Sequence, residues 1–112
     1  MTRFGLLVKV DQACASACEL EAYGFSQVPG MVVMGQFPTG GVEAERARGE
    51  FLLPEGMKFI VPTGRFTLPD GSIFLEGKGV QPAVKIPVDE ESVLSGRDVV
   101  LEEAVDYILA GL

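Results

Sequence analysis

Apolar residues form short runs along the first third of the chain, and each run has the spacing of a different element. Residues 3–11 (RFGLLVKVD) combine an apolar run with charged ends, which predicts a strand that ends at Asp11. Residues 15–25 (ASACELEAYGF) repeat apolar positions at helical spacing, which predicts a helix. Residues 31–35 (MVVMG) are wholly apolar and predict a short buried strand of the kind found in parallel sheets. The order of strand, helix and strand predicts a right-handed βαβ crossover.

The remainder of the chain is richer in glycine, proline and charge. Residues 36–50 predict a charged, Gly-rich loop, and residues 51–77 predict short strands separated by turns that Pro and Gly favour. The prolines in residues 78–88 predict an extended segment at a sheet edge. Residues 89–112 predict one long helix or two, with Asp98 capping the main one. The predicted fold class is α/β: a βαβ unit followed by a β-rich block and a terminal helix.

Length and charge narrow the possible roles. The 112 residues suffice for a single domain, 1–112, and the apolar share of 47% supplies a core. The formal net charge of −7 argues against nucleic-acid partners, which bind basic surfaces; most of the acidic excess lies in residues 89–112 and is interpreted as a solvated helix face. No apolar run approaches the roughly 18 residues that cross a bilayer, and residues 1–11 are too short for a signal peptide. We therefore expect no transmembrane segment.

Cys14 and Cys18 are the only cysteines, and the chain has no histidine. A disulfide between residues one turn apart in a single helix is geometrically awkward, so both thiols are expected to be free and packed as small apolar side chains. Two thiols without histidine or further cysteine also lack the ligand number of a zinc site. We expect neither a disulfide nor a metal site.

Ser16 lies at the start of the first predicted helix, just after a predicted strand. A serine in this place is near the positive end of the helix dipole and beside backbone N–H groups that no helical carbonyl accepts. Such N–H groups can stabilise an oxyanion during acyl transfer, which makes Ser16 a candidate nucleophile. Serine is also favoured at helix starts as a capping residue. On position alone, both roles stay open.

The sequence around Ser16 resembles the nucleophile segment of the S41 family of serine peptidases, the carboxyl-terminal (tail-specific) processing proteases and their tricorn-like relatives. In that family a strand ends in an acidic residue and is followed by Ser-Ala-Ser-Glu, whose first serine is the nucleophile; residues 16–19 here read Ser-Ala-Cys-Glu. Residues 31–41 look like the family's apolar strand and the loop after it. Residues 62–88 are similar to its closing block, including the turn GKGVQP. The resemblance covers nearly the whole chain in the same order.

This resemblance implies a ClpP/crotonase-like core, of which the chain would be the C-terminal half. It implies that Ser16 is the nucleophile, that the backbone N–H of Ala17 is an oxyanion donor, and that no cofactor is used. The general-base lysine of the bacterial members falls on Gly41, and their supporting glutamine falls on Glu45. Gly41 has no side chain to accept a proton, and Ala83 replaces an aspartate of the closing turn.

The remaining lysines offer no obvious replacement for that base. Lys78 lies in a turn and is interpreted as a solvated surface residue, whereas the face of Lys58 in its alternating strand is not fixed by the sequence. A base from a missing N-terminal portion or from another chain is therefore expected. Tricorn-like relatives supply such a base as a histidine.

Two functions stay open on this resemblance. The first is a serine-type peptidase that cleaves a peptide or protein substrate through an acyl-enzyme, with this chain carrying the nucleophile half and inactive alone. The second is a catalytically silent S41-like interaction or peptide-binding module, which Gly41 and Ala83 favour. The fold also serves acyl-CoA hydratases, but no CoA-binding feature stands out here.

A half-core would leave an apolar face or strand edge uncovered, so we expect homo-oligomers or association with the missing N-terminal half. The family suggests a periplasmic or cell-envelope location, which the sequence itself does not fix.

Overall fold

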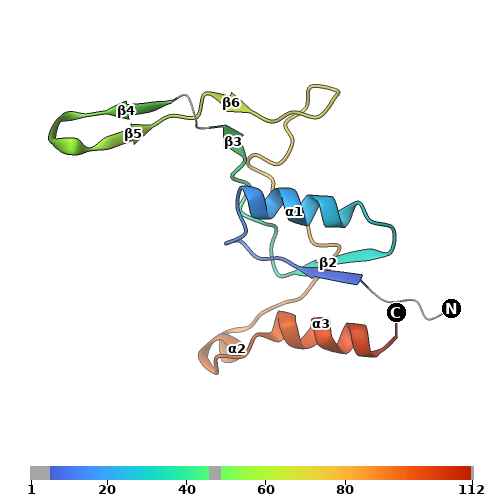
Figure 1. Cartoon of the computed structure of the whole chain (residues 1–112). Helices are drawn as coiled ribbons and strands as arrows, with labels where there is room; N and C mark the ends of the chain where they lie inside the picture. The colour runs from blue at the N-terminus through green and yellow to red at the C-terminus, as the bar shows by residue number, and fades with distance from the viewer. Residues whose placement is uncertain (1–5, 46–48, 112) are drawn as a thin grey trace.

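The centre of the fold is a three-stranded parallel sheet (Figure 1). The computed structural model describes residues 6–45 and 49–111. The strands lie in the spatial order β1 (Leu6–Lys9), β2 (Met31–Gly35) and β7 (Val84–Lys85). Helix α1 (Ala17–Ser26) joins β1 to β2, which confirms the predicted strand–helix–strand unit. The proline-marked segment contributes β7 at the edge of the sheet, as predicted.

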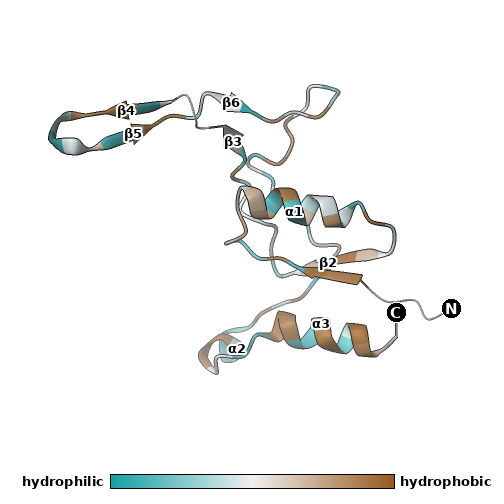
Figure 2. Ribbon diagram, viewed as in Figure 1, coloured by the Kyte–Doolittle hydropathy of each residue, from teal (hydrophilic) through white to brown (hydrophobic). Residues whose placement is uncertain are grey.

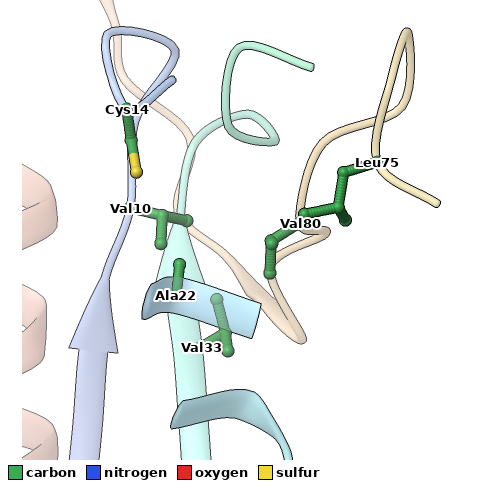
Figure 3. Close-up of a cluster of buried hydrophobic side chains, with 6 residues drawn as sticks. All are labelled: Val10, Cys14, Ala22, Val33, Leu75 and Val80. Carbon is green, nitrogen blue, oxygen red and sulfur yellow. The ribbon is translucent and has the colours of Figure 1, made fainter. Parts of the chain in front are cut away.

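Helices cover both faces of this sheet, with α1 on one side and α3 (Val99–Leu109) on the other (Figure 1). Consecutive residues of a strand point to opposite faces, and β2 follows this rule. Val33 packs with Ala22 of α1 in one buried cluster (Figure 3), whereas Met34 packs with Val100 and Ala104 of α3 in another. The wholly apolar sequence of β2 is thus explained by burial on both sides.

The terminal segment forms two helices rather than one. Helix α2 (Glu90–Leu94) is followed by α3, and the two are capped by Asp89 and Asp98, whose carboxylates accept the N–H groups of Ser92 and Leu101. The predicted cap at Asp98 is confirmed. In the described part of the chain, no helix is long and apolar enough to cross a membrane.

The β-rich block extends away from the sheet. It consists of short elements: β3 (Ala44–Glu45), β4 (Glu50–Leu52), the 3-10 turn η1 (Pro54–Gly56), β5 (Lys58–Ile60) and β6 (Gly64–Arg65). β4 and β5 form an antiparallel hairpin, and β3 pairs with β6 at its base. The radius of gyration is 17.8 Å, against about 13 Å for a compact domain of this length. The projecting hairpin accounts for this elongated shape (Figure 1).

The β4–β5 hairpin carries hydrophobic residues (Figure 2), and several of them are exposed. We call residues 49–61 the hairpin arm. Its exposed apolar residues are Phe51, Leu52, Leu53, Met57, Phe59 and Ile60. An exposed apolar patch of this kind is typical of an interaction surface. The arm therefore agrees with the expectation that a larger assembly covers part of this chain.

Candidate active site

Ser16 occupies the turn between β1 and α1 in a backbone conformation that side chains rarely adopt. Its φ is 58° and its ψ is −122°, and its side chain is exposed. An ordinary capping residue has an extended backbone, so capping alone does not explain these angles. A non-glycine residue in such a region costs about 1–3 kcal/mol and persists only where its surroundings impose it. Strained turns between a strand and a helix are a known way to expose a nucleophilic serine.

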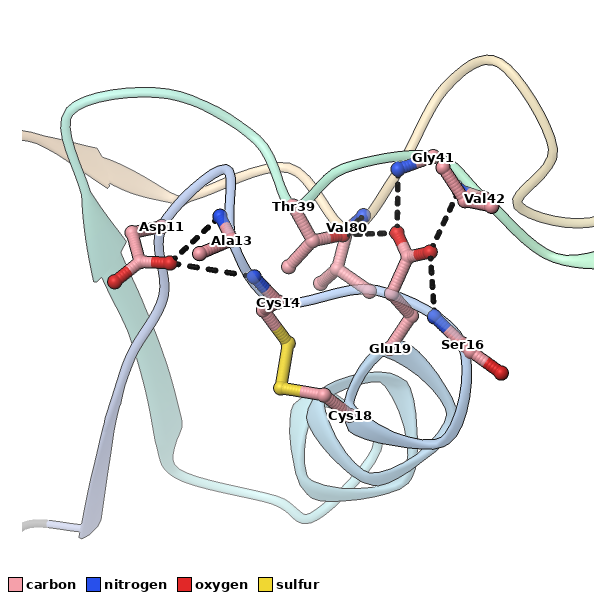
Figure 4. Close-up of a disulfide and its surroundings, with 10 residues drawn as sticks. All are labelled: Asp11, Ala13, Cys14, Ser16, Cys18, Glu19, Thr39, Gly41, Val42 and Val80. Carbon is pink, nitrogen blue, oxygen red and sulfur yellow. Dashed lines mark hydrogen bonds between the residues drawn. A yellow bond between two sulfur atoms is a disulfide. The ribbon is translucent and has the colours of Figure 1, made fainter.

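The first amides of α1 are free around this turn. The N–H of Glu19 donates to the Ser16 carbonyl at 2.8 Å, whereas the N–H groups of Ala17 and Cys18 have no acceptor among the described residues. The Ser16 hydroxyl points away from the Glu19 carboxylate (Figure 4). Free N–H groups at a helix start can stabilise a negative charge that develops nearby.

Glu19 is the buried centre of the turn, with a relative exposure of 0%. Its carboxylate accepts four hydrogen bonds (Figure 4), from Thr39 Oγ1 at 2.6 Å and from the backbone N–H groups of Gly41 at 2.7 Å, Val42 at 2.8 Å and Ser16 at 3.2 Å. Burial acts to raise the pKa of this carboxyl, but the hydrogen bonds outweigh burial and hold the pKa below its usual range. This anion therefore ties the nucleophile turn to the loop that follows β2, together with the direct hydrogen bond from the Ser16 N–H to the Val42 carbonyl at 3.0 Å.

That loop is in turn fixed by the GKGV segment. Thr39 Oγ1 accepts the N–H of Val80 at 2.7 Å while it donates to Glu19, and the Gly41 carbonyl accepts the N–H of Gly77 at 2.7 Å. A Cβ atom on Gly79 would lie 2.3 Å from the Thr39 carbonyl oxygen, so only glycine permits this approach. The GKGV segment, which resembles a family motif in sequence, thus holds the loop at residues 39–41 that binds Glu19.

Gly41, which falls at the lysine position of the resembled family, has a structural role here. Its N–H binds Glu19, its φ is +69°, and a Cβ atom would lie 3.0 Å from the backbone nitrogen of Lys78. Three lysines make their contacts elsewhere: Lys9 pairs with Asp98, Lys58 pairs with Glu50 on the hairpin arm, and Lys78 donates to the Ile73 carbonyl at 3.2 Å. None of these contacts brings an amine to Ser16.

Two other residues from the resemblance have backbone roles. Glu45 pairs with Gly64 between β3 and β6, and its side chain lies outside the described residues. The N–H of Ala83 donates to the Val33 carbonyl at 2.9 Å, which attaches the closing turn to the central sheet. No aspartate is needed for that attachment.

Glu43 is a buried acid that sequence reasoning missed. Its exposure is 3%, its Oε2 has no hydrogen-bond partner among the described residues, and its N–H donates to the Glu76 carboxylate. Burial raises the pKa of its carboxyl, and the nearby charges of Glu19 and Glu76 add to the rise. A charged residue in a Gly-rich loop is normally expected in solvent, so the sequence carries no signal for this burial.

Cys14 and Cys18 form a disulfide, contrary to the expectation of free thiols. The expectation was wrong because it placed both residues in one helix. Helix α1 begins only at Ala17, so Cys14 lies on the turn before it, and the two Cα atoms are 5.3 Å apart, within the range of a disulfide. The disulfide spans Ser16 (Figure 4).

A shallow cavity of about 420 Å³ lies beside this disulfide. Apolar residues of β1, α1 and the turn between them line most of it, including Val8, Val10, Ala22 and Phe25. Among the described residues, no group of three or more His, Cys, Asp or Glu side chains is arranged to hold a metal ion, in this cavity or outside it.

Comparison with known proteins supports the fold. No protein-family model and no curated protein matches the chain. Among solved structures, the chain is similar to a crystal structure described as a candidate peptidase from Parabacteroides merdae, with a TM-score of 0.65 and 22% sequence identity. The match covers 92% of this chain but only 31% of the other, so this chain spans less than a third of that protein's length. At this identity the similarity concerns the fold alone.

Proposed function

We propose that this chain carries the nucleophile half of a serine peptidase of the S41 type, with a ClpP/crotonase-like core. The observation that carries the proposal is the backbone of Ser16: a strained turn between strand and helix, with an exposed hydroxyl beside free amides. A solved structure that is described as a candidate peptidase and shares the fold agrees with it.

In this mechanism the Ser16 oxygen attacks the carbonyl carbon of a peptide bond while a base takes the hydroxyl proton. The free N–H of Ala17 donates to the resulting oxyanion. The C–N bond then breaks, the protonated base gives its proton to the leaving amine, and water hydrolyses the acyl-enzyme by the same route. Lys9, Lys58 and Lys78 contact other groups, so the proposal assigns the base to a polypeptide outside this chain.

A fluorophosphonate probe tests the proposal. Imidazole at high concentration supplies an external base, and we expect it to accelerate labelling of Ser16, mapped by peptide mass spectrometry. Ser16→Ala should abolish the adduct. Ser26→Ala, at the other end of α1, is the matched control and should leave it unchanged. Labelling that persists in Ser16→Ala would remove Ser16 as the nucleophile.

A catalytically silent interaction module is the second candidate function. The observation in its favour is Gly41, whose positive φ and close contact with the Lys78 backbone disfavour a lysine at this position. This alternative predicts that Ser16 stays unlabelled with imidazole and in the longer parent polypeptide, while the chain still binds a protein or peptide partner. Measured hydrolysis that depends on Ser16 would rule it out.

A further inference from the structure

The Cys14–Cys18 disulfide encloses the candidate nucleophile. Each cysteine lies two residues from Ser16, on opposite sides, and their bond closes a small ring that contains it (Figure 4). Because the cysteines are not in one helix, the bond joins two separate parts of the fold: the turn after β1 and the first turn of α1. The bond therefore restricts the segment whose backbone is strained.

The ring is anchored firmly at the Cys14 end. Cys14 belongs to the buried cluster beneath α1 (Figure 3), its N–H donates to the Asp11 carboxylate at 3.3 Å, and its carbonyl accepts the N–H of Gly40 at 2.8 Å. The other end, Cys18, lies in the first turn of α1 and is exposed. The disulfide consequently fixes the start of the helix relative to the core.

Glu19 restrains the same turn from a different side. The Ser16 N–H donates to the Glu19 carboxylate at 3.2 Å and to the Val42 carbonyl at 3.0 Å. The Ser16 carbonyl accepts the N–H groups of Glu19 at 2.8 Å and Leu20 at 3.2 Å. These hydrogen bonds restrain the angles on both sides of the Ser16 Cα, but each of them can open without breaking the chain. The covalent ring limits those angles because it fixes the distance between residues two positions before and two positions after. A cross-link acts mainly by removing alternative conformations.

We propose that the Cys14–Cys18 disulfide is a positioning element for Ser16, so that the reactivity of the nucleophile depends on thiol redox state. This inference rests on the proposed role of Ser16. In the oxidised chain the ring holds the hydroxyl exposed beside the free amides of Ala17 and Cys18. In the reduced chain the turn relaxes towards ordinary backbone angles, and the hydroxyl leaves that position.

The redox step is a dithiol–disulfide exchange. A thiolate of an external dithiol such as dithiothreitol attacks one sulfur, the exposed Cys18 side being open to it, and the S–S bond breaks with release of the Cys14 thiolate. The second thiol of the reagent then displaces the Cys18 thiolate and closes a cyclic disulfide. The chain gains two electrons and two protons, and the reagent loses them.

The test compares the labelling rate of Ser16 by a fluorophosphonate, with imidazole as base, before and after reduction by dithiothreitol. We expect reduction to slow labelling by roughly tenfold or more, because small displacements of a reacting group carry penalties of this size, and reoxidation should restore the rate. The Cys14→Ser, Cys18→Ser double variant should be slow in both conditions. Circular dichroism checks that each form keeps its helices.

Amide hydrogen exchange gives a second readout that needs no chemistry at Ser16. Reduction should accelerate exchange at the N–H of Ser16 while the amides of α3 stay protected. If oxidised and reduced chains are labelled equally fast, or if exchange at Ser16 is unchanged, the positioning role is wrong and the nucleophile proposal survives. If Ser16 is labelled neither in the oxidised chain nor in the longer parent polypeptide, the proposed function fails, and exchange alone decides the positioning role.

Discussion

Glu19→Gln is the most informative single change, because it removes the charge that ties Ser16 to the loop at residues 39–42. Gln keeps one oxygen, which can still accept from Thr39 and the Gly41 N–H. Its NH₂ group, however, would face the N–H groups of Val42 and Ser16, so two acceptor contacts become donor–donor contacts. The substitution keeps the size of the side chain and changes only its hydrogen bonding.

The expected loss is large for a conservative change. Hydrogen bonds to a charged group contribute about 1.5–3 kcal/mol each, so two lost bonds predict a decrease of about 3–6 kcal/mol in the free energy of unfolding. The Ser16 N–H keeps its hydrogen bond to the Val42 carbonyl, which favours the lower value of about 3 kcal/mol and lowers Tm by roughly 12 °C or more. Glu19 is fully buried, so solvent does not screen this effect.

Chemical denaturation at several pH values tests whether the negative charge of Glu19 is the source of this stabilisation. Because the folded-state pKa of Glu19 is below its unfolded value, its stabilising contribution is present above the unfolded pKa and is lost as pH falls through the folded pKa. The difference between the wild type and Glu19→Gln should therefore shrink with acidification. Glu21→Gln, an exposed acid on the same helix, is the matched control and should change stability by less than about 0.5 kcal/mol. Equal effects of the two substitutions would refute the role given to Glu19.

Three further predictions concern other parts of the molecule. Glu43→Gln should stabilise the chain at neutral pH and leave its stability unchanged at low pH, because the raised pKa of Glu43 means that its protonated form, which the fold favours, is lost as pH rises through the folded pKa. Denaturation curves without this pH trend would contradict the prediction. Gly41→Lys should lower stability by about 1 kcal/mol or more, given its positive φ, and should not accelerate Ser16 labelling; a gain in labelling would show that a lysine here can act as the base. The hairpin arm should drive self-association, so the double substitution Leu52→Lys, Phe59→Lys should lower the mass measured by light scattering, whereas the control Glu55→Lys should not. A wild-type chain that is monomeric at high concentration would overturn this prediction.

The strand–helix–strand order could be read from the sequence because it depends on local periodicity. The apolar run of β2 and the cap at Asp98 are local signals, and both are confirmed. The disulfide was missed because it depends on where α1 begins, and a shift of a few residues at a helix start decides whether Cys14 lies inside it. Helix ends are among the features that sequence patterns fix least well.

The candidate site was predictable only in part, for a similar reason. The spacing of Ser16 and Glu19 is that of a capping box, so their contact has a sequence signal. The contacts of Glu19 with Thr39 and Gly41 join residues about twenty positions apart and depend on how the loop folds back over α1. No local pattern reports such a contact, and none reports the burial of Glu43.

The most direct test of the account is the identity of the residue that a fluorophosphonate modifies when imidazole replaces the missing base. We expect one adduct per chain, located by mass spectrometry on the oxygen of Ser16, and faster labelling as imidazole is added. An adduct on a tyrosine or on another serine, or complete inertness of Ser16 both here and in the longer parent polypeptide, would show that the strained turn does not present a nucleophile.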